Sequence, residues 1–201
     1  MILSILAEMA EEYARFFKAH LEQFISVLAQ ITKSDFVQEF EPKLRHIAVE
    51  VLVILAQRAP VMARNMPGNK FVLTAIDAIL KLMMDQHDDP EWAMRYDDED
   101  EDMEDDGWSV GCHAIKRLSG AIRKKYFIRP ALHAVRTWTK HPDWRCRSAA
   151  LLALSQLGEI LPDDTEDQRK LVLYILQYFR DKNPHVQYAA VHCIGQLSVD
   201  L

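Results

Sequence analysis

The highest concentration of ionisable side chains in the sequence is a run of carboxylates at residues 97–106. Nine of the ten residues are acidic, and the run contains no Lys or Arg. A block of like charges repels itself, stays hydrated and attracts cations over roughly 8–10 Å at physiological salt. The run therefore predicts salt-sensitive capture of Lys- and Arg-rich partners through Asp97, Asp98, Glu99, Asp100, Glu101, Asp102, Glu104, Asp105 and Asp106.

Two other interpretations of the acidic run stay open. Charge runs often serve only to keep a chain hydrated. A calcium site is the weaker alternative, because the spacing lacks the Gly and the terminal Glu of an EF-hand loop. The run lies between two helices rather than at a terminus, which favours a binding role. Trp92, Tyr96 and Trp108 flank the run, and we expect them to hold its ends against the helices.

No other residues have the spacing of a catalytic, metal or cofactor site. Cys112-His113 has no further Cys or His at ligand spacing, whereas a stable zinc site needs four ligands. The six glycines are scattered and form no phosphate-binding loop. We therefore expect no catalytic residue, no metal and no cofactor, and a protein that is not an enzyme. The basic residues Lys116-Arg117 and Arg123-Lys124-Lys125 are expected to be solvated or to pair with nearby acids.

Composition limits the possible classes of protein. Three distant cysteines (Cys112, Cys146 and Cys193) indicate no disulfide framework and favour a reducing compartment. The net charge is −6, but without residues 97–106 there remain 24 basic and 21 acidic groups, about +3. This balance argues against direct binding of nucleic acid. Because no run of eighteen apolar residues occurs, no membrane span is expected.

The elements that position the acidic run are predicted to be helices. Apolar residues recur every three or four positions almost throughout the chain, as in Leu21, Phe24, Ile25, Leu28 and Ile31. Thr165 and Gln168 form a capping-box pattern at a predicted helix start. Residues 147–157 also align with residues 187–197 at an offset of 40, with a weaker echo from Arg45. A period near 40 with two helices in each unit is typical of HEAT repeats.

The predicted architecture is an all-α, right-handed HEAT-repeat solenoid, an α-α superhelix. It has a leading helix at 1–14 and four helix pairs at 17–58, 69–122, 126–158 and 165–198, with the acidic loop inserted at 86–107. Small residues at the repeated positions, such as Ala149-Ala150 and Ala189-Ala190, would let neighbouring helices approach closely. Solenoids need capped ends, and the absence of obvious polar caps predicts a fragment of a longer array. We expect this fragment to be monomeric.

Several segments resemble the importin-beta (karyopherin-beta) family of nuclear transport receptors. They are Leu44-Arg45-His46-Ile47-Ala48-Val49-Glu50-Val51-Leu52-Val53, then Pro142-Asp143-Trp144-Arg145-Cys146-Arg147-Ser148-Ala149-Ala150, and Asn183-Pro184-His185-Val186-Gln187-Tyr188-Ala189-Ala190. The resemblance covers essentially the whole chain. It implies a superhelix whose second helices line a concave, cargo-binding side, with Ran-GTP as the trigger of cargo release. It further implies nuclear pore FG repeats as partners, and shuttling between cytoplasm and nucleus.

The resemblance also implies roles for particular residues. The nine acids and Trp108 match a family loop that contacts Ran and helps to displace basic cargo. Trp144 and Arg147 are candidate contacts on the concave side. Gln187 stands where the family usually has Arg, and the amino-terminal repeats that form the main Ran site lie outside this chain.

The favoured function is a nuclear import receptor segment that binds basic cargo, such as ribosomal-protein-like chains or nuclear localisation signals. The alternative is a structural HEAT scaffold, as in a phosphatase regulatory subunit or a chromosome-organising complex.

Overall fold

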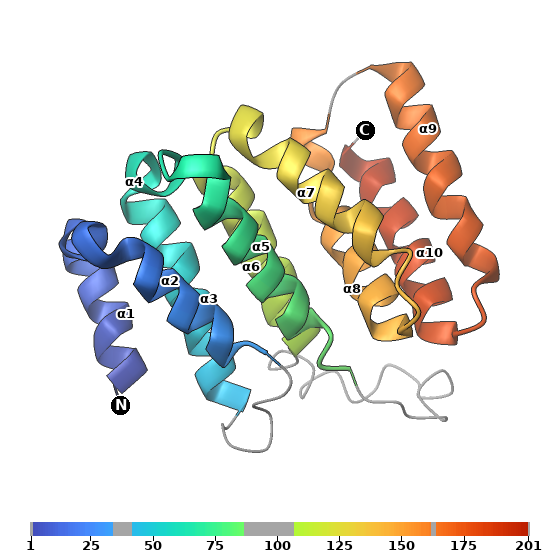
Figure 1. Ribbon diagram of the computed structural model, residues 1–201. Helices are drawn as coiled ribbons and strands as arrows, with labels where there is room; N and C mark the ends of the chain where they lie inside the picture. Colours follow the sequence, from blue (N-terminus) through green and yellow to red (C-terminus); the bar gives the residue numbers. More distant parts are fainter. Residues whose placement is uncertain (1, 34–41, 87–106, 162–163, 201) are drawn as a thin grey trace.

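The described part of the chain folds into two layers of helices. A computed structural model describes residues 2–33, 42–86, 107–161 and 164–200. The first-helix layer consists of α2 (Leu21–Ile31), α5 (Lys70–Met83), α7 (Lys124–Trp138) and α9 (Thr165–Leu176). The second-helix layer lies behind it in Figure 1 and consists of α1 (Ile2–Tyr13), α3 (Pro42–Arg58), α6 (Gly107–Ala121), α8 (Trp144–Ser155) and α10 (Pro184–Asp200). Within these residues there is no strand, and the predicted all-α solenoid is confirmed.

Each helix of the second layer packs on its predecessor, from α1 through α3, α6 and α8 to α10. In the first layer, α2 packs on α5 and α5 packs on α7. The buried apolar residues form one continuous cluster from Ala10 to Leu197. The stacking of successive helix pairs therefore buries the apolar stripes of the individual helices.

The second-layer helices α3 and α8 lie deepest in the stack. Residues 51–56 of α3 and 148–155 of α8 are buried without interruption, which explains why their apolar residues do not form a single stripe. The most extensive helix–helix contact joins α8 to α10, and the small pairs Ala149-Ala150 and Ala189-Ala190 are fully buried. Larger side chains at these positions would separate two closely packed helices.

Some helix bounds differ from those that the sequence predicts. The first predicted helix pair, 17–58, is expected to open with one helix at 17–32, but the structure has a 3-10 helix, η1 (Ala14–His20), followed by α2. Between α3 and α5 the structure adds a short helix, α4 (Pro60–Arg64), and a turn in which Gly68 and Asn69 have φ of 63° and 55°. Glycine and asparagine tolerate this left-handed conformation, which reverses the chain into α5.

The start of α9 also differs in its cap. The helix begins at Thr165, but the capping side chain is that of Asp164, whose carboxylate accepts hydrogen bonds from the N–H groups of Glu166 and Asp167 at 3.0 Å. The prediction that Thr165 is the capping residue is wrong by one position. Asp and Thr are both good caps, so residue type alone did not choose between them.

The predicted acidic loop, 86–107, falls almost wholly outside the described residues. Gln86 and Gly107 are described, but the nine acids at 97–106 and the flanking Trp92 and Tyr96 are not. In the described part of the chain no helix combines the length and the apolarity that a membrane crossing requires.

Candidate functional site

The described residues nearest to the acidic run are Asp85, Gln86 and Gly107, and they lie where α5 ends and α6 begins, at the lower edge of the molecule in Figure 1. Gly107 lies so close to the last turn of α5 that a Cβ there would be 2.7 Å from the Leu82 carbonyl oxygen. It would also be 3.0 Å from Cβ of Asp85. Glycine allows this approach because it has no side chain. The two helices therefore bring the ends of the insertion together.

Asp85 is held by the preceding helix pair. Nη1 of Arg45, on α3, donates to Oδ2 of Asp85 at 2.8 Å. The same guanidinium donates to the carbonyl oxygens of Lys81 at 3.3 Å and Thr32 at 3.5 Å. Arg45 is only 2% exposed, so its charge depends on these partners instead of water. The contact fixes the last turn of α5 against the neighbouring repeat.

Gln86 is held by the following helix pair. Its backbone carbonyl accepts a hydrogen bond from Nε of Arg145 at 3.2 Å, and its Oε1 accepts one from Oγ of Ser148 at 3.0 Å. Both donors belong to α8. The side-chain Nε2 of Gln86 donates to the Met83 carbonyl oxygen at 2.8 Å. Gln86, the last residue described before the acidic run, is therefore held by α8 and by the end of α5.

We call this group the loop base: Arg45, Asp85, Gln86, Gly107, Arg145 and Ser148. It joins three consecutive helix pairs at the point where the acidic insertion leaves and re-enters the fold. Trp108, the residue after Gly107, is partly buried and packs against the core. Its predicted role in partner binding stays a prediction.

Sequence reasoning did not identify the loop base. One signal was present, because Arg45 and Arg147 occupy equivalent positions in the repeat alignment. Their acidic partners lie 40 and 34 residues downstream, a separation that helical periodicity cannot reveal.

Trp144 and Arg147, the two candidate concave-face contacts, both take part in packing between repeats. The ring of Trp144 stacks on that of His185, with centroids 4.6 Å apart. Arg147 makes a two-pronged ion pair with Asp181, at 2.8 and 2.7 Å, and donates to the carbonyl oxygens of His141 and Pro142. Cargo contact by either residue stays a prediction.

The electrostatics of the Arg147–Asp181 pair follow from this geometry. Burial acts to raise the pKa of Asp181, but hydrogen bonds from Arg147 and from backbone N–H groups outweigh it and leave the pKa below its usual value. The pKa of Arg147 is raised, chiefly by its hydrogen bond to Asp181. Both groups are therefore charged near neutral pH, and the pair serves as a clamp between α8 and the corner after α9.

Two cations of α6 also pair across repeats. Arg117 donates to Oε2 of Glu50 at 2.7 Å and to Oε1 of Gln57 at 2.8 Å, both on α3. Lys116 lies 3.2 Å from a carboxylate oxygen of Glu159. These acids are consequently already engaged with cations, and they are less available to a basic ligand than free carboxylates would be.

The cysteines have the properties of core residues. Cys112, Cys146 and Cys193 are buried free thiols. Burial raises the pKa of Cys112 and of Cys193 to about 12, and burial is also the main reason why the pKa of Cys146 rises to about 11. The thiolate is the reactive form, so these groups are poor nucleophiles. Within the described ranges no cluster of three or more His, Cys, Asp or Glu could hold a metal ion.

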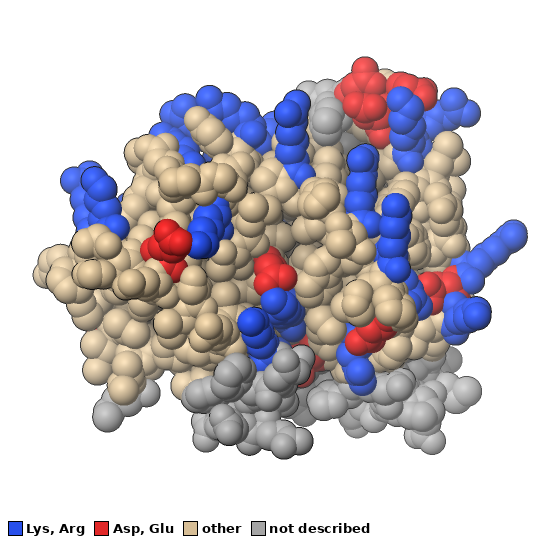
Figure 2. Space-filling view, in the orientation of Figure 1, with Lys and Arg blue, Asp and Glu red and all other residues tan. Residues whose placement is uncertain are grey.

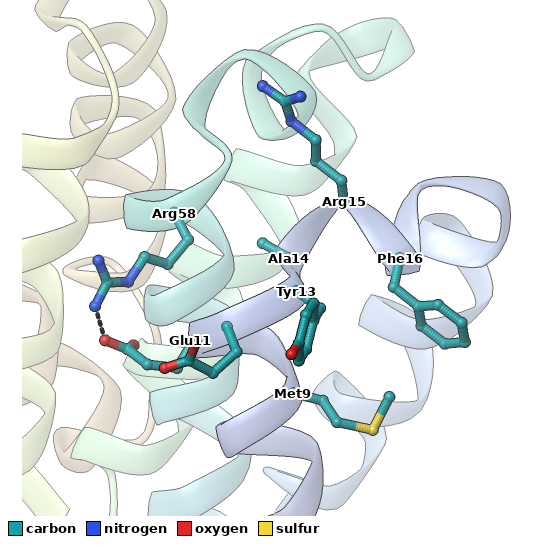
Figure 3. A pocket seen from close by; sticks show the side chains of 8 residues that line it. Met9, Glu11, Tyr13, Ala14, Arg15, Phe16 and Arg58 are labelled. Carbon is teal, nitrogen blue, oxygen red and sulfur yellow. Dashed lines mark ion pairs between the residues drawn. The ribbon is translucent and has the colours of Figure 1, made fainter.

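An open pocket of about 630 Å³ lies where α1 meets η1 (Figure 3). Glu11 points toward Arg58 of α3 and forms an ion pair with it. Tyr13 and Phe16 lie on the rim and are 68% and 71% exposed. This lining contains no Ser, Cys or His.

Comparison with known proteins agrees with this geometry. Residues 37–127 match the family described as Importin repeat, and residues 171–201 match HEAT repeat. The chain is 25% identical over 202 aligned residues to importin subunit beta-3 of Saccharomyces cerevisiae, covering 99% of this chain and 18% of that protein. The chain thus spans under a fifth of the length of this relative.

Two solved structures share the fold along 99% of the chain and 19% of their own length. The structure of Kap121p bound to Nup53p has a TM-score of 0.86 and 25% identity. That of Kap121p bound to RanGTP has a TM-score of 0.85 and 24% identity. Together with the importin and HEAT repeat matches, these similarities support membership of the importin-beta family.

Proposed function

We propose that this chain acts as a segment of a nuclear transport receptor, a non-enzymatic role in which its acidic run captures basic cargo. The observation that carries the proposal is the loop base, which ties the insertion bearing nine carboxylates to three successive helix pairs. The named relative is an importin, and Kap121p was crystallised with Nup53p. Cargo and receptor would therefore meet near the end of α5.

The ion pairs on the second-helix layer support a leading role for the run in cargo capture. Glu50 and Glu159 are paired with Arg117 and Lys116. A Lys- or Arg-rich cargo would have to displace these cations, whereas the run contains no cation of its own. Because exposed charges act at long range, the run would mainly increase the rate of encounter.

Ran in its GTP form is the proposed trigger of cargo release. Kap121p was crystallised with RanGTP, and the family resemblance implies that the acidic loop contacts Ran. Binding of Ran at this loop would compete with a basic cargo segment for the same carboxylates. Nuclear pore FG repeats and shuttling between nucleus and cytoplasm belong to the same proposal.

The test is the affinity of a fluorescent Lys/Arg-rich peptide for the chain at low and high salt. Neutralising four acids of the run (D97N/D98N/E99Q/D100N) should weaken binding at least tenfold at 50 mM salt, since exposed charges are weakly screened there. The matched control neutralises four exposed acids elsewhere (E8Q/E12Q/E166Q/D167N) and should change affinity less than twofold. Equal losses in both variants would contradict the proposal.

A second arm tests Ran. Adding RanGTP to the peptide complex should release peptide, and RanGDP should not. A chain that binds neither the peptide nor RanGTP would favour the structural-scaffold alternative.

A further inference from the structure

The stretch that follows the acidic run has the opposite charge. Residues 107–142 contain no Asp or Glu and hold eight Lys or Arg: Lys116, Arg117, Arg123, Lys124, Lys125, Arg129, Arg136 and Lys140. This stretch comprises α6, α7 and the turn after α7. In a chain whose net charge is −6, such segregation produces a cationic surface wherever no acid from another element comes close.

Three of these cations are bound within the fold. Arg117 and Lys116 pair with Glu50 and Glu159, and Nζ of Lys124 donates to the Leu161 carbonyl oxygen at 2.9 Å. Lys125 lies over the ring of its neighbour Tyr126. Arg129, Arg136 and Lys140 are exposed, and no acid of the described residues lies within 4.0 Å of their charged nitrogens.

Several of the exposed basic residues share one face of α7. At 100° per residue, Lys125, Arg129, His133 and Arg136 fall within an arc of about 80°. Lys140 lies in the turn two residues after the helix ends, and all five residues are exposed. We call these five residues the α7 row. It lies in the first-helix layer, and in Figure 2 Lys and Arg side chains follow the diagonal course that α7 takes in Figure 1.

We propose that the α7 row is a docking surface for an extended acidic segment of a partner protein. Lys125 and Lys140 are 15 positions apart, and the 13 steps that lie within α7 correspond to about 20 Å along the helix axis. An extended peptide advances about 3.3 Å per residue, so seven residues would cover this length. Acids at alternate positions would project to one side about 6.6 Å apart, close to the rise of about 6 Å between Lys125 and Arg129, whereas Arg129 and Arg136 are about 10.5 Å apart along the axis.

The burial of the aromatic residues of α7 favours an acidic peptide over a nucleic acid. Proteins that bind single-stranded DNA or RNA combine phosphate contacts with aromatic side chains on which the bases stack. The aromatic residues of α7 do not provide such a platform, because Phe127 is fully buried and Tyr126 and Trp138 are partly buried in the core. The net negative charge of the whole chain would also oppose a long polyanion more strongly than a short peptide.

The docking surface and the proposed cargo site differ in charge. Basic cargo would approach the acidic run, whereas the α7 row would take a ligand of the opposite sign. The two can therefore fail or succeed independently.

The experiment measures binding of a fluorescent twelve-residue peptide of alternating Glu and Ser by anisotropy at 50 mM salt. The variant R129Q/R136Q/K140Q should bind at least fivefold more weakly than the unaltered chain, with a smaller salt dependence. The control R15Q/K18Q/K43Q removes the same charge from exposed positions outside the row and should bind within twofold of the unaltered chain. Circular dichroism should show unchanged helix content in both variants.

Two outcomes would overturn the proposal. Equal weakening in the two variants would mean that the peptide senses only net charge. A twelve-nucleotide single strand that binds more tightly than the peptide, and loses affinity in the row variant, would assign the surface to nucleic acid instead.

Discussion

Cations of the second-helix layer and cations of α7 differ in what they contact. Arg45, Arg117 and Arg147 each donate to a carboxylate from a neighbouring repeat, with N–O distances of 2.7–2.8 Å. On α7, Arg129 and Arg136 are exposed and have no acidic partner among the described residues. Arginine thus joins neighbouring repeats in the second-helix layer but is exposed to solvent on α7, in the first-helix layer.

The difference shows how a solenoid can separate stability from recognition. Each paired Arg links residues at least 34 positions apart in sequence, so it reinforces the interface on which a stack of repeats depends. Within the described residues, no cation of the α7 row pairs with an acid of another repeat. We therefore expect substitution of a paired Arg to lower the free energy of unfolding in proportion to its burial. Substitutions in the α7 row should affect ligand binding alone.

The largest effect is expected for Arg45→Ala. This guanidinium is 2% exposed and serves Asp85, Lys81 and Thr32. Its removal leaves a carboxylate and two carbonyl groups without their donor, together with a cavity. Breaking a buried ion pair costs about 3–5 kcal/mol, and Asp85 is partly exposed, so we expect a loss of about 3 kcal/mol in urea denaturation.

The matched control is Arg129→Ala, on the exposed face of α7. A surface substitution without a partner should change the free energy of unfolding by less than about 0.5 kcal/mol. If both variants were equally destabilised, burial would not distinguish the two layers and the comparison would fail.

An intermediate effect is expected for Asp181→Asn. The substitution removes the carboxylate that holds Arg147 and should cost about 1–3 kcal/mol at neutral pH, as expected for a hydrogen bond to a charged group. The pKa of Asp181 in the folded chain lies below the reference value of 3.8. Its contribution to stability is thus present above pH 3.8 and is lost as the pH falls through the folded-state pKa.

The stability difference between unaltered chain and Asp181→Asn should therefore be constant above about pH 5 and shrink toward pH 3. Chemical denaturation at several pH values measures it. A difference that grew on acidification would mean that the carboxylate is not stabilised in its charged form.

The fold was predictable from sequence because helix pairs carry their information locally. The 3.6-residue period and the offset between Arg147 and Gln187 need only short windows, and both led to the solenoid that the structure confirms. The errors lie where local signals compete. Asp164 and Thr165 are adjacent, equally suitable caps, and η1 retains enough apolar periodicity to be read as one helix with α2.

The candidate site was only partly predictable. The acidic run is evident from composition alone, but the loop base depends on Arg145 and Gln86, which are 59 residues apart. The role of Arg147 shows the same limit. The family resemblance predicts a concave-face contact for Arg147, which stays a prediction, but nothing in the sequence indicated its ion pair with Asp181 in the next helix pair.

The smallest effect is expected for the exposed pair of Arg117 and Glu50, which are 39% and 42% exposed. Solvent screens such pairs, and their coupling is typically about 0–1 kcal/mol. A double-mutant cycle with R117Q and E50Q should give a coupling of about 0.5 kcal/mol at low salt, vanishing near 1 M salt, where the Debye length is about 3 Å. Because Arg117 also bonds Gln57, the R117Q variant alone should lose slightly more stability than E50Q. A salt-independent coupling above about 2 kcal/mol would make this exposed pair comparable in strength to the buried Arg45–Asp85 pair. Burial would then not explain the order of stability effects among the three Arg–carboxylate pairs.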